Sequence, residues 1–340
     1  MPFIYIYVMK RLSFLSAALI MAAACTAQGP QKIILDTDLG NDVDDVLAID
    51  IMHKFADEGR VQILAVMTNK DTPQAPELAD ILDTWYGRPE IPVGKVTDGV
   101  TGGSADDYAL KVCSMTSEDG SPLFEHSHSG DFPDAVTLYR QILSEQPDHS
   151  VAIVSTGFSS NLARLLASGP DRYSKLSGRD LVARKVSLVS CMAGGISNPD
   201  AREYNVVQDI PSAQELFKDC PVQVVMSPQE LGQNIRYPAS SISGDFDWGV
   251  EHPMVQCYVS YKQMPYDRQT WDLTSMLYVV EPEYFTVSEP GTIEVTDEGC
   301  TRFTPSESGQ HRYISADEGQ RNRILARFIE IITRKPANLK

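Results

Sequence analysis

The stretch KIILDTDLGNDVDD, residues 32–45, decides the fold and is the strongest functional feature of the chain. Its opening residues 32–35 are an apolar run typical of a short buried parallel strand. From Asp44 the apolar residues recur three or four positions apart, as one face of a helix requires. The stretch therefore predicts a strand, an acidic loop and a helix, and ligands of open α/β sheets bind at such strand ends.

The same alternation continues along the chain. It predicts strands at residues 61–66, 151–154, 186–189 and 222–225, and helices at residues 44–55, 75–86, 135–143, 161–166, 213–217 and 317–333. Such alternation predicts a single Rossmann-like α/β domain, residues 30–335, with a mostly parallel central sheet and helices on both faces. Residues 100–130 are predicted to form a long loop, and residues 283–315 short strands and turns.

Five carboxylates crowd the ten residues from position 36 to position 45: Asp36, Asp38, Asp42, Asp44 and Asp45. They repel one another unless a cation lies among them. Helix capping explains one or two of them, but not those at the strand end. Oxygen ligands suit calcium or magnesium, and an irregular loop favours the geometrically tolerant calcium.

Two other kinds of acidic loop compete with this interpretation. A helix-loop-helix calcium loop needs Gly at its sixth position and Glu at its twelfth, where this chain has Asn41 and Leu47. A phosphate-transferring hydrolase would use Asp36 as nucleophile and Asp38 as acid or base. That alternative leaves Asp44 and Asp45 without a role.

The balance of charge argues against a nucleic-acid partner. The chain of 340 residues has a formal net charge of −17, and Lys10-Arg11 is its main basic run. Binding a phosphate backbone calls for clustered Lys and Arg.

The N-terminus indicates export. Lys10-Arg11 precede the apolar run 12–24, as in a secretory signal that starts at Met9. The run is shorter than the ~20 residues that span a bilayer, although an anchor that starts at residue 1 is the alternative. Cys25 follows small residues, as at a bacterial lipoprotein cleavage site. We expect residues 1–28 to be a signal and linker, and the protein to be periplasmic or membrane-anchored through lipid on Cys25.

The other cysteines are few and scattered: Cys113, Cys191, Cys220, Cys257 and Cys300. An odd and widely spaced set is neither a disulfide framework nor a zinc site. We expect most of them to be buried as small apolar residues.

The motif Asp36-x-Asp38-x-Gly40 followed by Asp44-Asp45 resembles the signature of the inosine-uridine-preferring nucleoside hydrolase family. The resemblance extends along nearly the whole mature chain. The further segments that carry it are Thr68-Asn69, residues 155–163, residues 192–195 with Asn198, residues 203–205 and residues 271–276.

This resemblance implies a set of site residues. Calcium would be bound by Asp38, Asp45, Asp272 and the backbone carbonyl of Thr156, with Asp38 also acting as general base. The residues expected to position the sugar are Asp44, Asn69, Asn198, Glu203 and Asn205, whereas Asp36 supports the loop by hydrogen bonding.

The chain departs from the family at the leaving-group side. Trp271 stands where the family commonly has the His that assists the departing base. Trp271 either stacks on the base or packs in the core. His126 and His128 could replace that acid if their loop closes, although exposed loop histidines are the favoured interpretation. Leu39 replaces a Pro that is frequent in the family. The loop from Gly40 to Asp44 has two more residues than the shortest family version, which leaves Asp42 without a counterpart. A shifted alignment would therefore exchange the roles of Asp42, Asp44 and Asp45.

The expected function is calcium-dependent hydrolysis of the N-glycosidic bond of ribonucleosides or related ribosides, in purine or pyrimidine salvage. The resemblance also implies a small-molecule riboside as the partner and a dimer or tetramer as the assembly. The alternatives are a non-catalytic riboside-binding homologue and an Asp-dependent phosphohydrolase.

Overall fold

Strand β1 (Gln31–Thr37) lies between β4 and β2 in the central sheet of the computed structural model, which describes residues 29–103, 108–128, 130–248 and 251–339. The strand order is β11-β10-β12-β6-β5-β4-β1-β2-β3, with β9 beside β12. The other strands of this sheet are β2 (Val61–Lys70), β3 (Val93–Val100), β4 (Val151–Thr156), β5 (Val186–Met192), β6 (Val224–Ser227), β9 (Thr286–Val287), β10 (Gly291–Val295), β11 (Thr301–Pro305) and β12 (His311–Ser315).

Every pairing from β12 across to β3 is parallel, which confirms the predicted mostly parallel sheet. Strand β10 is antiparallel to both β11 and β12, and β9 is antiparallel to β12. Parallel pairing brings the carboxyl ends of successive strands to one edge of the sheet.

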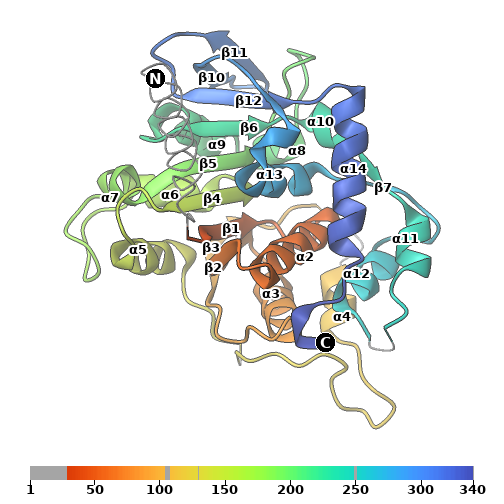
Figure 1. Cartoon of the computed structure of the whole chain (residues 1–340). Coiled ribbons are helices and arrows are strands. Elements are labelled where there is room, and N and C mark those ends of the chain that lie inside the picture. Colours follow the sequence, from red (N-terminus) through yellow and green to blue (C-terminus); the bar gives the residue numbers. More distant parts are fainter. Residues whose placement is uncertain (1–28, 104–107, 129, 249–250, 340) are drawn as a thin grey trace, which may run out of the picture.

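Helices cover both faces of this sheet, because the strand side chains alternate between two apolar cores (Figure 1). Ile33 and Leu35 face one core, and Ile34 faces the other. The first core is covered by α2 (Asp44–Asp57), α3 (Gln74–Trp85), α4 (Tyr108–Cys113), α12 (Pro253–Tyr261), α13 (Trp271–Val280) and α14 (Glu318–Ile332). The second is covered by α5 (Ala135–Glu145), α6 (Ser160–Ala167), α7 (Gly178–Lys185) and α9 (Ile210–Asp219).

Shorter elements connect these layers. They are α8 (Tyr204–Gln208), α10 (Gln229–Gln233), α11 (Ala239–Gly244), the 3-10 helices η1 (Pro282–Tyr284) and η2 (Ala337–Leu339), and the two-stranded sheet of β7 (Arg236–Tyr237) and β8 (Arg268–Gln269). Among the described residues, no helix combines the length and apolar character that crossing a membrane requires.

The structure corrects several predicted boundaries. The predicted loop 100–130 contains α4, whose Tyr108 is fully buried. Strand β3 was missed, and β6 begins at Val224 rather than at residue 222. Strand β2 ends at Lys70, one residue after the Thr68-Asn69 pair at which it was predicted to end. The C-terminal strands do not form a separate unit, because β12 pairs with β6 and so extends the central sheet.

No disulfide joins any two of the described cysteines. Cys191, Cys220, Cys257 and Cys300 are buried. The predicted signal, including Cys25, lies outside the described residues.

The long C-terminal helix α14 packs against α2, which carries Asp44 and Asp45 at its start (Figure 1). Phe328 of α14 is completely buried in the shared core. We predict that Phe328→Ala lowers the free energy of unfolding by about 3–5 kcal/mol, measured by urea denaturation, because it leaves a cavity beneath α2. The exposed Asn322→Ala on the same helix should change it by less than about 0.5 kcal/mol. Equal stability of the two variants would contradict this packing.

Candidate active site

The carboxyl ends of β1, β4 and β5 meet the first turns of α2 and α13 around one cavity of about 310 Å³. Thr37 of β1 is in register with Thr156 of β4, so the loop after β1 starts beside the end of β4. Residues distant in the sequence thereby line the same cavity: Asp38, Asn41, Asp42, Asp44, Asp45, Thr156, Met192, Glu203, Tyr204, Asn205, Gln229, Tyr261, Arg268, Trp271 and Asp272.

Asp38, Asp45 and Asp272 are three buried carboxylates of this cavity, each at most 5% exposed, and Asp44 and Glu203 are buried to a similar degree. Burial, with the nearby charge of Asp42, raises the pKa of Asp38 to about 7. Burial and the neighbouring carboxylates raise the pKa of Asp45 and of Asp272 well above the ordinary range. The three groups therefore resist simultaneous ionisation unless a cation compensates them.

The donors around these carboxylates bear on whether a metal ion fits. In the conformation of the structure, no three His, Cys, Asp or Glu side chains in the described part of the chain are arranged to bind a metal ion. Asn41 Nδ2 donates to Asp38, and Thr37 Oγ1 donates to Asp45. Thr156 Oγ1 and Asn41 Oδ1 are buried without a hydrogen-bond partner among the described residues. The donor set contains oxygen without thiolate or imidazole, and so it suits a hard cation such as calcium.

Two side chains that sequence reasoning missed hold the acidic loop in place. Tyr108 of α4 accepts from Gly40 N at 3.0 Å and donates to Asp42 O at 2.8 Å. Lys70, at the end of β2, donates through Nζ to Gly40 O at 2.9 Å. Tyr108 lies in a segment that was predicted to be a loop, and Lys70 follows the Thr68-Asn69 pair without belonging to the motif.

Asp36 supports the loop from below and does not line the cavity. Its carboxylate is fully buried and accepts from Asn69 Nδ2 at 2.8 Å, Asn161 Nδ2 at 3.0 Å and Tyr139 Oη at 2.9 Å. Burial raises its pKa to about 6. This placement agrees with its predicted supporting role, and it removes the nucleophile that a phosphohydrolase would need.

Asn69 belongs to the same buried network, although it was predicted to contact a sugar. Its Oδ1 accepts from Phe158 N at 2.9 Å, so both ends of its amide are used inside the protein. Gly157 lies against it, and a Cβ there would stand 2.4 Å from Asn69 Oδ1 and 2.5 Å from Asp38 N. Only glycine permits this approach, and Asn69 therefore positions the loop of Asp38.

Asp44 joins the acidic loop to α13. Its Oδ2 accepts from Asp272 N at 3.1 Å, and its Oδ1 lies 3.3 Å from Arg268 Nη2. Arg268 also pairs with Asp42, and its guanidinium lies 5.2 Å from the Tyr261 ring centroid and 4.9 Å from that of Trp271. Sequence reasoning missed Arg268 because it is a lone basic residue without a motif.

Glu203 and Asn205, two residues predicted to position the sugar, line the cavity from the start of α8. Glu203 caps this helix and accepts from Asn205 N at 2.8 Å, Gly194 N at 3.0 Å and Val206 N at 3.1 Å. Burial raises its pKa to about 7. Asn198 is exposed and accepts from Asp200 N at 3.1 Å, so the structure does not bring this predicted residue to the cavity.

Trp271 lines the cavity and is only partly buried, which favours a wall position over a core position. Its Nε1 donates to Gln229 O at 2.9 Å. Neither His126 nor His128 lines the cavity; His128 Nδ1 lies 2.5 Å from Asp80 Oδ1, and His126 is exposed. The favoured interpretation of both as loop histidines fits these positions.

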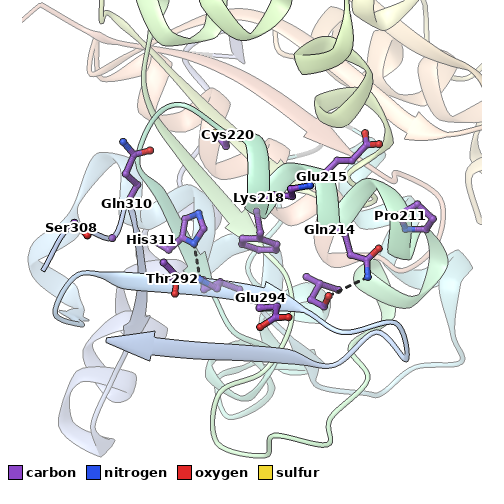
Figure 2. A pocket seen from close by; sticks show the side chains of 14 residues that line it. Pro211, Gln214, Glu215, Lys218, Cys220, Thr292, Glu294, Ser308, Gln310 and His311 are labelled. Carbon is purple, nitrogen blue, oxygen red and sulfur yellow. Dashed lines mark hydrogen bonds between the residues drawn. The ribbon is translucent and has the colours of Figure 1, made fainter. Parts of the chain in front are cut away.

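A second hollow, of about 740 Å³, lies between α9 and strands β10 and β12 (Figure 2). Its imidazole, His311, accepts from Ile293 N at 2.7 Å, and burial lowers its pKa. The carboxylates Glu215 and Glu294 are exposed on its rim. The His311 imidazole is already hydrogen-bonded to the backbone and the two glutamates are exposed to solvent, so these groups do not point toward a common ligand. We therefore place the candidate site in the smaller acidic cavity.

Comparisons with known proteins show the family to which the chain belongs. Residues 33–326 match the family described as inosine-uridine preferring nucleoside hydrolase. The chain is 30% identical over 225 residues to the pyrimidine-specific ribonucleoside hydrolase RihA of Salmonella paratyphi B, covering 64% of this chain. The same match covers 66% of the Salmonella protein, slightly under two thirds of its length.

Solved structures show the same fold. A plant nucleoside hydrolase superposes with a TM-score of 0.68 at 21% identity, covering 90% of this chain and 100% of the plant chain. A purine-preferring ribonucleoside hydrolase from Gardnerella vaginalis superposes with a TM-score of 0.68 at 17% identity, covering 89% of this chain and 98% of the other.

The Asp36 network generates a stability prediction. Asp36→Ala leaves the donors of Asn69, Asn161 and Tyr139 buried without an acceptor, and should lower the free energy of unfolding by about 3 kcal/mol or more in urea denaturation. Asp36→Asn retains one acceptor oxygen and should cost less. Wild-type stability of Asp36→Ala would show that this network does not hold the loop.

Proposed function

Because the chain belongs to the inosine-uridine preferring nucleoside hydrolase family, we propose that it hydrolyses the N-glycosidic bond of ribonucleosides or related ribosides, releasing base and ribose. The observation that carries the proposal is the shared position of Asp38, Asp45 and Asp272 in one cavity of a size suited to a small ligand. Family membership and this site support the same reaction.

Calcium is the proposed cofactor, and Asp38, Asp45, Asp272 and the backbone carbonyl of Thr156 would hold it. When bound, the ion supplies a positive charge that lowers the pKa of a water molecule and binds sugar hydroxyls. The oxygen-only donor set and the mutual repulsion of the buried carboxylates support this assignment.

Asp38 is the proposed general base, which takes a proton from the water that attacks the anomeric carbon. The C–N bond breaks through a state with positive charge on the sugar, and the carboxylates that line the cavity stabilise that charge. Asp44, Glu203 and Asn205 position the sugar, since hydroxyl groups need both acceptors and donors. Trp271 is proposed to face the base.

A non-catalytic riboside-binding protein is the second candidate, and Trp271 in place of the family's His favours it. Release of free ribose from a nucleoside panel, run beside a binding assay, separates the two. Binding without release would support the second candidate.

We also propose that residues 1–28 are an export signal and linker, with a domain over residues 30–335. The basic pair Lys10-Arg11, the apolar run after it and Cys25 support a periplasmic or lipid-anchored location. A dimer or tetramer is proposed from the family resemblance alone.

The role of Asp38 can be tested directly. Asp38→Ala should reduce ribose release by at least ~100-fold, the lower range for loss of a positioned acid or base. The control is Asp148→Ala, an exposed aspartate that precedes β4 at the opposite end of the sheet and should leave turnover unchanged. Turnover within a few fold of wild type in Asp38→Ala would end the assignment.

The metal site can be tested without activity. After chelation, adding calcium at about 100 times its dissociation constant should raise the melting temperature by several degrees, since binding at that level stabilises by ~2.7 kcal/mol. Asp272→Asn should lose this rise, whereas Asp42→Asn should keep it. The same rise in Asp272→Asn would contradict the ligand assignment.

A further inference from the structure

Helix α13 carries Asp272, and its packing on the sheet decides where that carboxylate lies. Asp272 is the second residue of α13 and is separated from Asp44 by 228 positions in the sequence. The helix packs against β4, β5 and β6 (Figure 1). Metal sites tolerate errors in ligand distance of only ~0.2 Å, so a site that uses Asp272 needs a precise fit between α13 and these strands.

The face of the sheet beneath α13 changes from apolar to hydroxyl side chains toward the carboxyl ends of the strands. On β6, Val225 belongs to the first core, and Ser227 points to the same face two residues later. On β5, Leu188 packs against that core and Ser190 follows by the same alternation. Both serines are at most 1% exposed. Buried hydroxyl groups thus replace apolar side chains where the sheet approaches the cavity.

Helix α13 accepts hydrogen bonds from both of these serines. Thr274 Oγ1 donates to Trp271 O at 2.6 Å, and its one hydrogen is thereby used. Ser227 Oγ, 2.6 Å from Thr274 Oγ1, is therefore the donor of that pair. Ser190 Oγ donates to Ser275 O at 3.0 Å. The ends of β5 and β6 are thus hydrogen-bonded to the first two turns of α13.

Buried hydroxyl bonds of this kind contribute more to position than to stability. Apolar contact is not directional, so a helix can shift along an apolar surface at little cost. A hydrogen bond instead fixes a distance and an angle. Replacing both partners of a buried pair by apolar groups of the same shape is nearly neutral for stability. Apolar side chains would therefore hold α13 on the sheet equally well, but they would not fix its place.

We propose that Ser190, Ser227 and Thr274 are positioning residues, which set the place of Asp272 and thereby the affinity of the acidic cavity for calcium. The inference rests on the proposed calcium site and adds residues that do not line the cavity. They act through the backbone and the first turns of α13. Groups that orient metal ligands from the outer shell typically change metal affinity 10–100-fold when they are removed.

A double variant, Ser227→Ala with Thr274→Val, replaces one hydroxyl pair by apolar groups of similar shape. The calcium dissociation constant, measured by calorimetry on chelator-treated protein, should rise at least ~10-fold. The urea midpoint of the calcium-free protein should stay close to that of wild type, because both partners of the pair are removed together. The calcium concentration at half-maximal ribose release should rise by the same factor as the dissociation constant.

Three controls share this chemistry. Ser275→Ala removes a buried hydroxyl of the same helix that has no hydrogen-bond partner among the described residues. Tyr237→Phe with Ser241→Ala removes another buried hydroxyl pair, 2.7 Å apart, which does not line the cavity. Thr274→Ser keeps the hydroxyl group. All three should bind calcium as wild type does.

Each outcome decides the question. Wild-type calcium affinity in the double variant would overturn the inference and leave the calcium site standing. An equal loss of affinity in Ser275→Ala would show that packing alone sets the affinity, and this too would contradict the inference. A wild-type protein that binds no calcium would overturn both the inference and the proposed cofactor. Should the double variant fail to fold, Ser190→Ala removes only the bond to Ser275 O, and unchanged affinity there would overturn the inference equally.

Discussion

Repulsion among three buried carboxylates is the constraint on which the rest of the site depends. Asp38, Asp45 and Asp272 line one cavity, and burial makes their joint ionisation costly unless a cation compensates it. The surrounding contacts keep them there despite this cost. Asp36 and its amide partners lie beneath the loop, Gly157 lets β4 approach it, and Asp44 ties it to the first turn of α13. These buried hydrogen bonds fix the acidic side chains in position, so that negative charge is held at one place in the fold.

Sequence alone predicted the elements that depend on local periodicity. The strand, acidic loop and helix of residues 32–45 were predicted correctly, because the apolar spacing changes at Asp44. The position of β12 beside β6 was not predicted, because pairing between strands that are distant in the sequence leaves no local pattern. Helix α4 was hidden by its polar surroundings. The approach of Asp272 to the loop followed from family resemblance, whereas Arg268 carried no signal, and Asn198, predicted to position the sugar, is exposed and does not line the cavity.

Trp271 and Arg268 together form one wall of the cavity. Trp271 lies in the wall with its indole hydrogen donated to Gln229 O, so this wall presents aromatic surface to the cavity. Arg268 stabilises the acidic rim through Asp42 and Asp44 and lies over the ring of Trp271. Under the proposed function, sugar recognition rests on hydrogen bonding and base recognition rests on charge and π surface.

A crystal grown with calcium, measured at a wavelength where calcium scatters anomalously, tests the central claim most directly. The account predicts one strong anomalous peak inside the acidic cavity, about 2.3–2.6 Å from oxygens of Asp38, Asp45, Asp272 and the Thr156 carbonyl. An ordered cavity without such a peak at saturating calcium, or a peak bound only by Asp42 and Asp44 at the rim, would contradict it.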